Sequence, residues 1–148
     1  MLEAVYEIVS IKQVIKKRKA KHLLQLITSP EIAAAVARKE IGNEDREVFL
    51  VIVLNTKNEI AAIHRCHVGS LNASVVHPRE VFKAAILNNG SSIIVAHNHP
   101  SQNTTPSRED LEVTKRLVTV GQMIGIEVLD HLVVSENSYF SFKENGHI

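Results

Sequence analysis

Residues 91–110, SSIIVAHNHPSQNTTPSRED, join an apolar stretch, a polar loop and the beginning of a helix. Residues 91–96 are rich in β-branched side chains between polar neighbours, which predicts a buried strand. Ser107 is a good helix N-cap, and Leu111, Leu117 and Val118 repeat at helical spacing, so a helix is expected over 107–124. The stretch therefore predicts a strand–loop–helix unit of an α/β domain.

The polar loop of this unit carries three residues of the kind that bind metals. His97 and His99 leave the end of the strand, and side chains two residues apart on an extended chain point the same way. Asp110 follows in the first turn of the helix. Two imidazoles and one carboxylate form a typical catalytic zinc set that leaves a fourth position for water, although other divalent metals also suit it. The alternative is a helix capping box, in which Asp110 only reaches back to the Ser107 amide.

The rest of the chain alternates strands and helices around this unit. Ser29 and Pro30 begin a helix that extends to Ile41, and the apolar run 48–54 predicts a strand buried on both faces. The turn residues 55–58 predict that 59–68 returns as a hairpin partner. A helix is expected from Pro78 to about Gly90, and strands over 126–134 and 139–142. This order predicts a three-layer α/β/α domain with a mixed sheet.

The first 28 residues differ in character from the remainder. We divide the chain into a basic N-terminal arm, 1–28, and a domain, 29–148. Residues 5–10 suggest a short strand, and 11–22 carry a basic run of Lys12, Lys16, Lys17, Arg18, Lys19 and Lys21. This run predicts a solvated, partly helical arm or, alternatively, a segment that contacts nucleic acid. No aromatic residue is interleaved with the lysines, which argues against a base-stacking platform.

Composition narrows the class of protein. The 148 residues include 17 Lys+Arg and 16 Asp+Glu, a net charge of +1 that gives no general attraction to DNA or membranes. No apolar run is long enough to span a bilayer, the N-terminus does not resemble a signal peptide, and Cys66 is the one cysteine, so we expect a cytoplasmic protein. The sequence has no P-loop, no Gly-x-Gly-x-x-Gly, no His-Glu-x-x-His and no Cys-x-x-Cys.

The spacing of the metal-type residues resembles a known motif. His-x-His, seven residues, Ser, two residues and Asp is the JAMM motif of the MPN-plus (JAB) metallohydrolases, and His97, His99, Ser107 and Asp110 match it without a gap. The strings VHPREVF at 76–82, AHNHPS at 96–101, PSRED at 106–110 and LDH at 129–131 resemble the bacterial RadC family. The resemblance covers 29 to the C-terminus. It implies a JAB/MPN-like, cytidine deaminase-like fold, in a short form without the N-terminal helix-hairpin-helix region of longer members.

The resemblance also implies a role for each matching residue. His97, His99 and Asp110 would bind one Zn²⁺, and Ser107 would stabilise an oxyanion. Glu47, immediately before the buried strand 48–54, would hold the zinc-bound water and act as general base. A carboxylate entering a buried strand is costly unless it has a partner, which agrees with that role. The other candidates for the base are Glu44, Asp45, Glu80 and Glu109. RadC loops usually have glycine where this chain has Gln102, so the shape of the loop is a point of difference.

The sequence is compatible with two functions. The first is a zinc-dependent metallohydrolase with peptidase or isopeptidase chemistry, acting on a peptide or protein substrate. The second is a DNA-repair or mobile-element associated binding protein with a structural or vestigial metal site, in which DNA is a partner. Exposed strand edges would also suit a homodimer.

Other histidines are weaker candidates. His64, Cys66 and His67 invite comparison with a second metal cluster, but on a regular strand His67 would point away from the other two, so we expect a structural role. His131 lies inside an apolar strand and is expected to be a hydrogen-bonded structural residue rather than a ligand.

Overall fold

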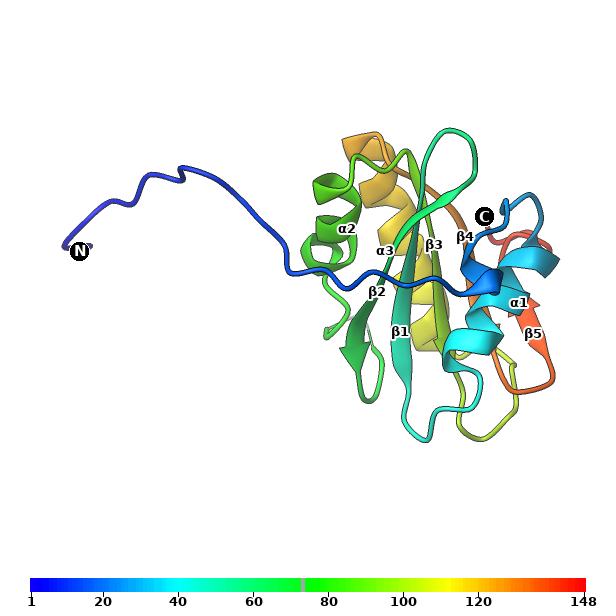
Figure 1. Cartoon of the computed structure of the whole chain (residues 1–148). Coiled ribbons are helices and arrows are strands. Elements are labelled where there is room, and N and C mark those ends of the chain that lie inside the picture. The colour runs from blue at the N-terminus through cyan, green and yellow to red at the C-terminus, as the bar shows by residue number, and fades with distance from the viewer. Residues whose placement is uncertain (73) are drawn as a thin grey trace.

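A five-stranded mixed sheet lies at the centre of the molecule in the order β2-β1-β3-β4-β5 (Figure 1). The structure is a computed structural model that describes residues 1–72 and 74–148. β3 and β4 are parallel, and the other three neighbouring pairs are antiparallel. The strands are β1 Val48–Leu54, β2 Ile60–Val68, β3 Ser92–Asn98, β4 Glu127–Val134 and β5 Tyr139–Ser141.

Three helices cover the two faces of this sheet. α1 (Pro30–Ile41) packs on one face, against a core that includes Leu50, Ile52 and Leu132. α2 (Pro78–Leu87) and α3 (Arg108–Ile124) pack on the other, against a core that includes Val51 and Val95. The predicted three-layer α/β class with a mixed sheet is confirmed, and the architecture is consistent with a JAB/MPN-like fold.

Local sequence signals begin and end these elements as expected. The Ser29 hydroxyl accepts a hydrogen bond from the Ile32 amide and caps α1, and Pro30 and Pro78 occupy the first turns of their helices. All seven residues of β1 are buried, because helices cover both faces of this central strand. Gly125 ends α3 in the left-handed conformation, with φ of 76°.

The pairing of β1 with β3 positions the candidate site. These strands are antiparallel, with Phe49 opposite His97, so the beginning of β1 lies beside the end of β3. Glu47 immediately precedes β1, and His97 is the penultimate residue of β3. The fold therefore brings the predicted base to the same edge of the sheet as the predicted metal ligands, across about fifty residues of sequence.

The N-terminal arm differs from the prediction. The strand expected at 5–10 is wrong: these residues are exposed and belong to no sheet, because a strand needs a partner with which to form ladder hydrogen bonds. The helical character expected over 11–22 is reduced to a 3-10 turn, η1 (Lys21–Leu23). Figure 1 shows the arm running across the domain and then away from it. None of the described helices is long and apolar enough to cross a membrane.

Candidate metal centre

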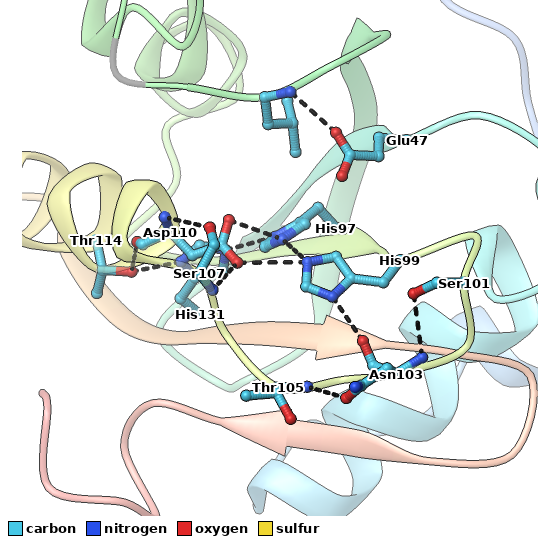
Figure 2. A network of polar contacts seen from close by, with 11 residues as sticks. Glu47, His97, His99, Ser101, Asn103, Thr105, Ser107, Asp110, Thr114 and His131 are labelled. Atoms are coloured by element: carbon cyan, nitrogen blue, oxygen red, sulfur yellow. Dashed lines mark hydrogen bonds and ion pairs between the residues drawn. The ribbon is translucent and has the colours of Figure 1, made fainter.

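Side-chain donor atoms of His97, His99 and Asp110 converge at the end of β3 (Figure 2). His97 Nε2 lies 3.1 Å from Asp110 Oδ1, His99 Nε2 lies 3.3 Å from Asp110 Oδ2, and the two Nε2 atoms are 3.1 Å apart. Within 1–72 and 74–148, this is the one group of three or more His, Cys, Asp or Glu residues that could hold a metal ion. The structure thus brings together the three residues predicted as ligands.

Each candidate ligand lies in a strand or helix or directly after one. β3 continues to Asn98, two residues beyond the predicted strand end, so His97 lies inside the strand and is 1% exposed. His99 follows the strand, and its backbone amide still bonds the Val134 carbonyl at the end of β4. Asp110 is the third residue of α3 and is 5% exposed. A strand end and a helix start hold the donors in place, so they do not depend on a long loop.

Asp110 serves both as a helix cap and as a member of the cluster. Its Oδ2 accepts the Ser107 amide at 2.8 Å, while the Ser107 hydroxyl accepts the Asp110 amide at 3.1 Å. This is the capping box that the sequence offered as an alternative to a metal site. The two interpretations are compatible, because a carboxylate can accept several hydrogen bonds and still offer lone pairs to a cation.

The charges within the cluster are coupled. Burial would raise the pKa of Asp110, but hydrogen bonds from His97 and His99 outweigh it and hold this pKa far below its usual value. The hydrogen bond to Asp110 raises the pKa of His99, against burial, and the Asn103 carbonyl and the charge of Glu47 add to the rise. The carboxylate is therefore ionised, and a positive charge beside it is favoured.

The donor chemistry fits a metal cation. His99 Nδ1 donates to the Asn103 carbonyl at 2.7 Å, since a carbonyl can only accept, and neutral His99 then presents the lone pair of Nε2 to the cluster. Two imidazole nitrogens and two carboxylate oxygens face one another over about 3 Å. Without a proton or a metal between them these lone pairs would repel. The residues that would hold a metal are His97, His99 and Asp110.

Glu47 lies near this cluster without bonding to it. Its Oε2 accepts the Leu71 amide at 2.9 Å, and its backbone carbonyl accepts the Gly69 amide at 2.8 Å. Figure 2 shows the Glu47 side chain on the same side of the sheet edge as His97 and His99. Glu47 is half-buried, whereas Glu109, one of the other candidates, is exposed on α3. The role of Glu47 as a base, like that of Ser107 toward an oxyanion, stays a prediction.

Asn98 is an important residue that the sequence pattern does not reveal. It lies between the two histidines, and its side chain is buried among backbone groups of the segment before β1. Its Oδ1 accepts the Val48 amide at 2.7 Å, and its Nδ2 donates to the carbonyls of Arg46 and Glu44 at 2.9 and 3.3 Å. The middle residue of the His-x-His string thus holds the strand entry that carries Glu47. The one hint of this role in the sequence is strand alternation: neighbouring strand residues point to opposite faces, so Asn98 would point away from the side of His97.

Gln102 occupies the loop position where RadC proteins usually have glycine. Its φ is 69°, in the left-handed region where glycine has no steric penalty. The Gln102 side chain accepts the Glu136 amide at 2.8 Å and so bonds this loop to the β4–β5 turn. This chain therefore keeps a loop conformation suited to glycine while using another residue.

The structure also settles the two weaker histidine sites. A bulge at Cys66 puts His67 opposite Phe49 and His64 opposite Val51, so both face the α2–α3 side, and the expectation that His67 points away is wrong. Even so, these residues form no three-donor metal group among the described residues.

His131 is buried and hydrogen-bonded to His97 and Thr114, which confirms its structural assignment.

Comparison with known proteins agrees with the geometry of the site. The family model described as the RadC-like JAB domain matches residues 27–147. The chain belongs to the RadC family. Among its RadC-type relatives, the UPF0758 protein TTE0897 of Caldanaerobacter subterraneus subsp. tengcongensis is 53% identical over 121 residues, which cover 82% of this chain and 52% of the relative.

Other relatives show the same extent of similarity. The UPF0758 protein BCG9842_B0662 of Bacillus cereus strain G9842 is 52% identical over 122 residues, covering 82% of this chain and 54% of that protein. A UPF0758 protein of Desulforamulus reducens is 47% identical over 121 residues, covering 82% and 53%. The chain thus spans about half the length of the curated relatives it matches, and the RadC domain is the part they share.

Proposed function

We propose that this RadC-family chain is a zinc-dependent metallohydrolase that cleaves an amide bond, of the peptide or isopeptide type, in a peptide or protein substrate. The observation that carries the proposal is the convergence of His97, His99 and Asp110 beside Glu47. A bound zinc ion supplies Lewis acidity and lowers the pKa of water. The ligand set of two histidines and one carboxylate leaves a coordination position for that water.

Two further side chains complete the proposed chemistry. Glu47 Oε2 is engaged by the Leu71 amide, and we assign Oε1 to accepting a proton from water and returning it to the leaving amine. The Ser107 hydroxyl oxygen accepts the Asp110 amide, which leaves its O–H free to donate to an oxyanion. The capping box fixes Ser107 relative to Asp110, so the donor and the metal ligand keep a constant separation.

The metal site is tested first and without a substrate. The protein is stripped with a chelator, reloaded with zinc, desalted and analysed for bound metal. We expect one zinc per chain, and its loss in the double variant His97→Ala/His99→Ala. His147→Ala serves as a control, since His147 is exposed and contacts Phe140 and Phe142. Full zinc retention in the double variant would show that the metal binds elsewhere.

Hydrolysis is tested next with a mixture of peptides and isopeptide-linked peptides in ¹⁸O-labelled water. Cleavage would place ¹⁸O in the new carboxylate, which mass spectrometry detects without knowledge of the sequence cleaved. We expect Glu47→Gln to keep its zinc and to lose at least about a hundredfold in rate, the scale of general base catalysis. Glu44→Gln, three residues away in the same segment, is the matched control. Equal loss in both variants would argue against Glu47 as the base.

A second candidate, DNA binding through the arm, has one observation in its favour. Lys12, Lys16, Lys17, Lys19 and Lys21 are exposed on the arm, although Arg18 is engaged by Glu40. We expect a salt-dependent gel shift that weakens when Lys16, Lys17 and Lys19 are changed to Gln, because each phosphate contact releases a counterion. Zinc binding should be unaffected by these changes, which separates the two candidates.

A further inference from the structure

A buried row of polar groups lies directly behind His97. His97 Nδ1 is 2.8 Å from His131 Nε2, and His131 Nδ1 is 2.5 Å from Thr114 Oγ1. The Thr114 hydroxyl in turn donates to the Asp110 carbonyl at 2.8 Å. Figure 2 shows the row passing from His97 through His131 to Thr114 on α3. His131 and Thr114 are 1% and 2% exposed, so water does not substitute for any of these partners.

The chemistry of the last link orders the protons along the row. A carbonyl only accepts, so the Thr114 hydroxyl gives its proton to Asp110, and its oxygen must accept from His131 Nδ1–H. A neutral imidazole that carries its proton on Nδ1 has an accepting Nε2. That Nε2 receives the Nδ1–H of His97. A neutral His97 is then left with a bare Nε2, which faces His99 and Asp110.

The surroundings of His131 hold its ring in place. Its ring stacks on Phe142, with centroids 4.6 Å apart and planes 9° apart, and meets Phe49 edge to face at 5.9 Å. A neutral ring held between two phenyl rings can act as an acceptor for His97 and a donor for Thr114 at the same time.

We propose that Thr114 and His131 are positioning residues that set the tautomer of His97, so that its Nε2 lone pair faces the metal position. This proposal rests on the zinc site proposed above. It assigns a part in metal binding to a threonine that contacts none of the ligand nitrogens. The principle is general: the hydrogen bond made by the second nitrogen of a metal-binding histidine decides which nitrogen binds.

The variant Thr114→Val tests the first link of the row. Valine keeps nearly the same shape but removes the acceptor for His131 Nδ1–H. His131 then either buries an unsatisfied donor or moves its proton to Nε2, where it faces the proton on His97 Nδ1. Because a buried unsatisfied donor is costly, we expect the proton to move to Nε2, and the His97 Nε2 lone pair is then disfavoured. We expect zinc affinity, measured by competition with a chromophoric chelator, to fall about 10- to 100-fold.

Two controls separate this effect from a general loss of helix stability. Thr114→Ser retains the hydroxyl and should bind zinc within a few-fold of the wild type. Thr119→Val makes the same change on the same helix, where the hydroxyl also bonds a carbonyl four residues back, that of Lys115, but is exposed. It should leave zinc affinity unchanged. Wild-type affinity in Thr114→Val, or an equal loss in Thr119→Val, would overturn the proposal.

The tautomers are read directly from imidazole ¹⁵N shifts of the zinc-loaded protein. We expect His131 to carry its proton on Nδ1 and to accept at Nε2; a proton on Nε2 would overturn the proposal. His131→Phe keeps a ring between Phe49 and Phe142 but removes both nitrogens, so it should weaken zinc binding by itself. Adding Thr114→Val to His131→Phe should then cause no further loss of affinity, because the link is already broken.

Different results would contradict the proposed function and the proposed role of Thr114 and His131. A wild-type protein that binds no stoichiometric zinc would contradict the proposed function. A wild-type protein that binds zinc normally, together with Thr114→Val and His131→Phe variants that bind it equally well, would contradict only the role of the row.

Discussion

Asn98 binds both peptide groups that flank Glu47. Its side chain accepts the Val48 N–H at 2.7 Å and donates to the Arg46 carbonyl at 2.9 Å. Because Asn98 also separates His97 from His99 at the end of β3, one residue links the backbone of the candidate metal ligands to the backbone of the proposed base. The position of Glu47 relative to the metal site therefore depends on a buried amide that does not itself face the site.

Replacing Asn98 with Ala should affect hydrolysis more than zinc binding. The change leaves the Val48 N–H and the Arg46 carbonyl without their partner, which costs about 1–3 kcal/mol of stability. His97 stays in β3 and the His99 amide stays bonded to Val134, so zinc affinity should change little, while the rate of ¹⁸O incorporation should fall toward that of Glu47→Gln. The control is Asn55→Ala: Asn55 also accepts two backbone amides, those of Lys57 and Glu59, but in the β1–β2 turn. Equal rate losses in the two variants would indicate simple destabilisation.

Zinc should stabilise the fold, and less so in acid. A ligand present at a hundred times its dissociation constant adds about 2.7 kcal/mol to the free energy of unfolding. The Asp110 hydrogen bond raises the pKa of His99 above its ordinary 6.5, so below that raised pKa the metal-free protein holds a proton there that zinc must displace. As pH falls through that raised pKa, zinc affinity should drop about tenfold per unit for one displaced proton. Calorimetric titration in buffers of different ionisation enthalpy counts the proton released. Affinity that does not change between pH 8 and pH 5.5 would contradict this prediction.

Glu40 should make the attachment of the arm sensitive to acid. Glu40 is 8% exposed, and its carboxylate accepts Arg18 Nη1 at 2.5 Å and contacts His22 Nε2 at 2.7 Å. Burial raises the pKa of Glu40, but these hydrogen bonds and charges outweigh it and hold the pKa below its ordinary 4.5. A lowered carboxyl pKa stabilises the folded state above the ordinary value, and this contribution is lost as pH falls through the lowered one.

The test compares Glu40→Gln with the wild type at two pH values. At pH 7 we expect the variant to lose about 1–3 kcal/mol in urea unfolding, because a buried charge-assisted bond is weakened. Trypsin should also cleave at Arg18 faster in the variant. At pH 3 the difference should shrink. Glu31→Gln, an exposed position on the same helix, is the control. A difference that is equal at both pH values would show that the charge of Glu40 is not the cause.

Two variants of Gln102 should separate backbone strain from its hydrogen bond. Both Gln102→Ala and Gln102→Gly lose the bond to the Glu136 amide, but only glycine adopts a φ of 69° without penalty. We expect the glycine variant to be more stable than the alanine variant by about 1 kcal/mol in urea unfolding. Zinc affinity should be similar in the two, since the His99 amide stays bonded to Val134. An alanine variant as stable as the glycine variant would show that the loop relaxes.

Much of the fold was readable because the signals are local. The buried strand 48–54 was predicted with its observed bounds, and α1 and α3 to within one residue, since hydrophobic runs and helix caps act over a few neighbouring residues. The candidate ligands His97, His99 and Asp110 were readable for the same reason: His97 and Asp110 lie only thirteen residues apart along the chain. The strand expected at 5–10 failed because β-branched residues indicate a strand only where a neighbouring strand is within reach.

The sequence by itself determined the strand–loop–helix unit, the candidate ligand set and the family. Only the tertiary structure decided what surrounds them: Asn98 with Val48 across fifty residues, His131 with His97 across thirty-four, and Arg18 with Glu40 across twenty-two. Ligand spacing is a property of one short segment, so it is encoded locally. The tautomer of a histidine and the placement of a base depend on hydrogen bonds from distant segments, and these contacts exist only once the sheet has set the register of its strands.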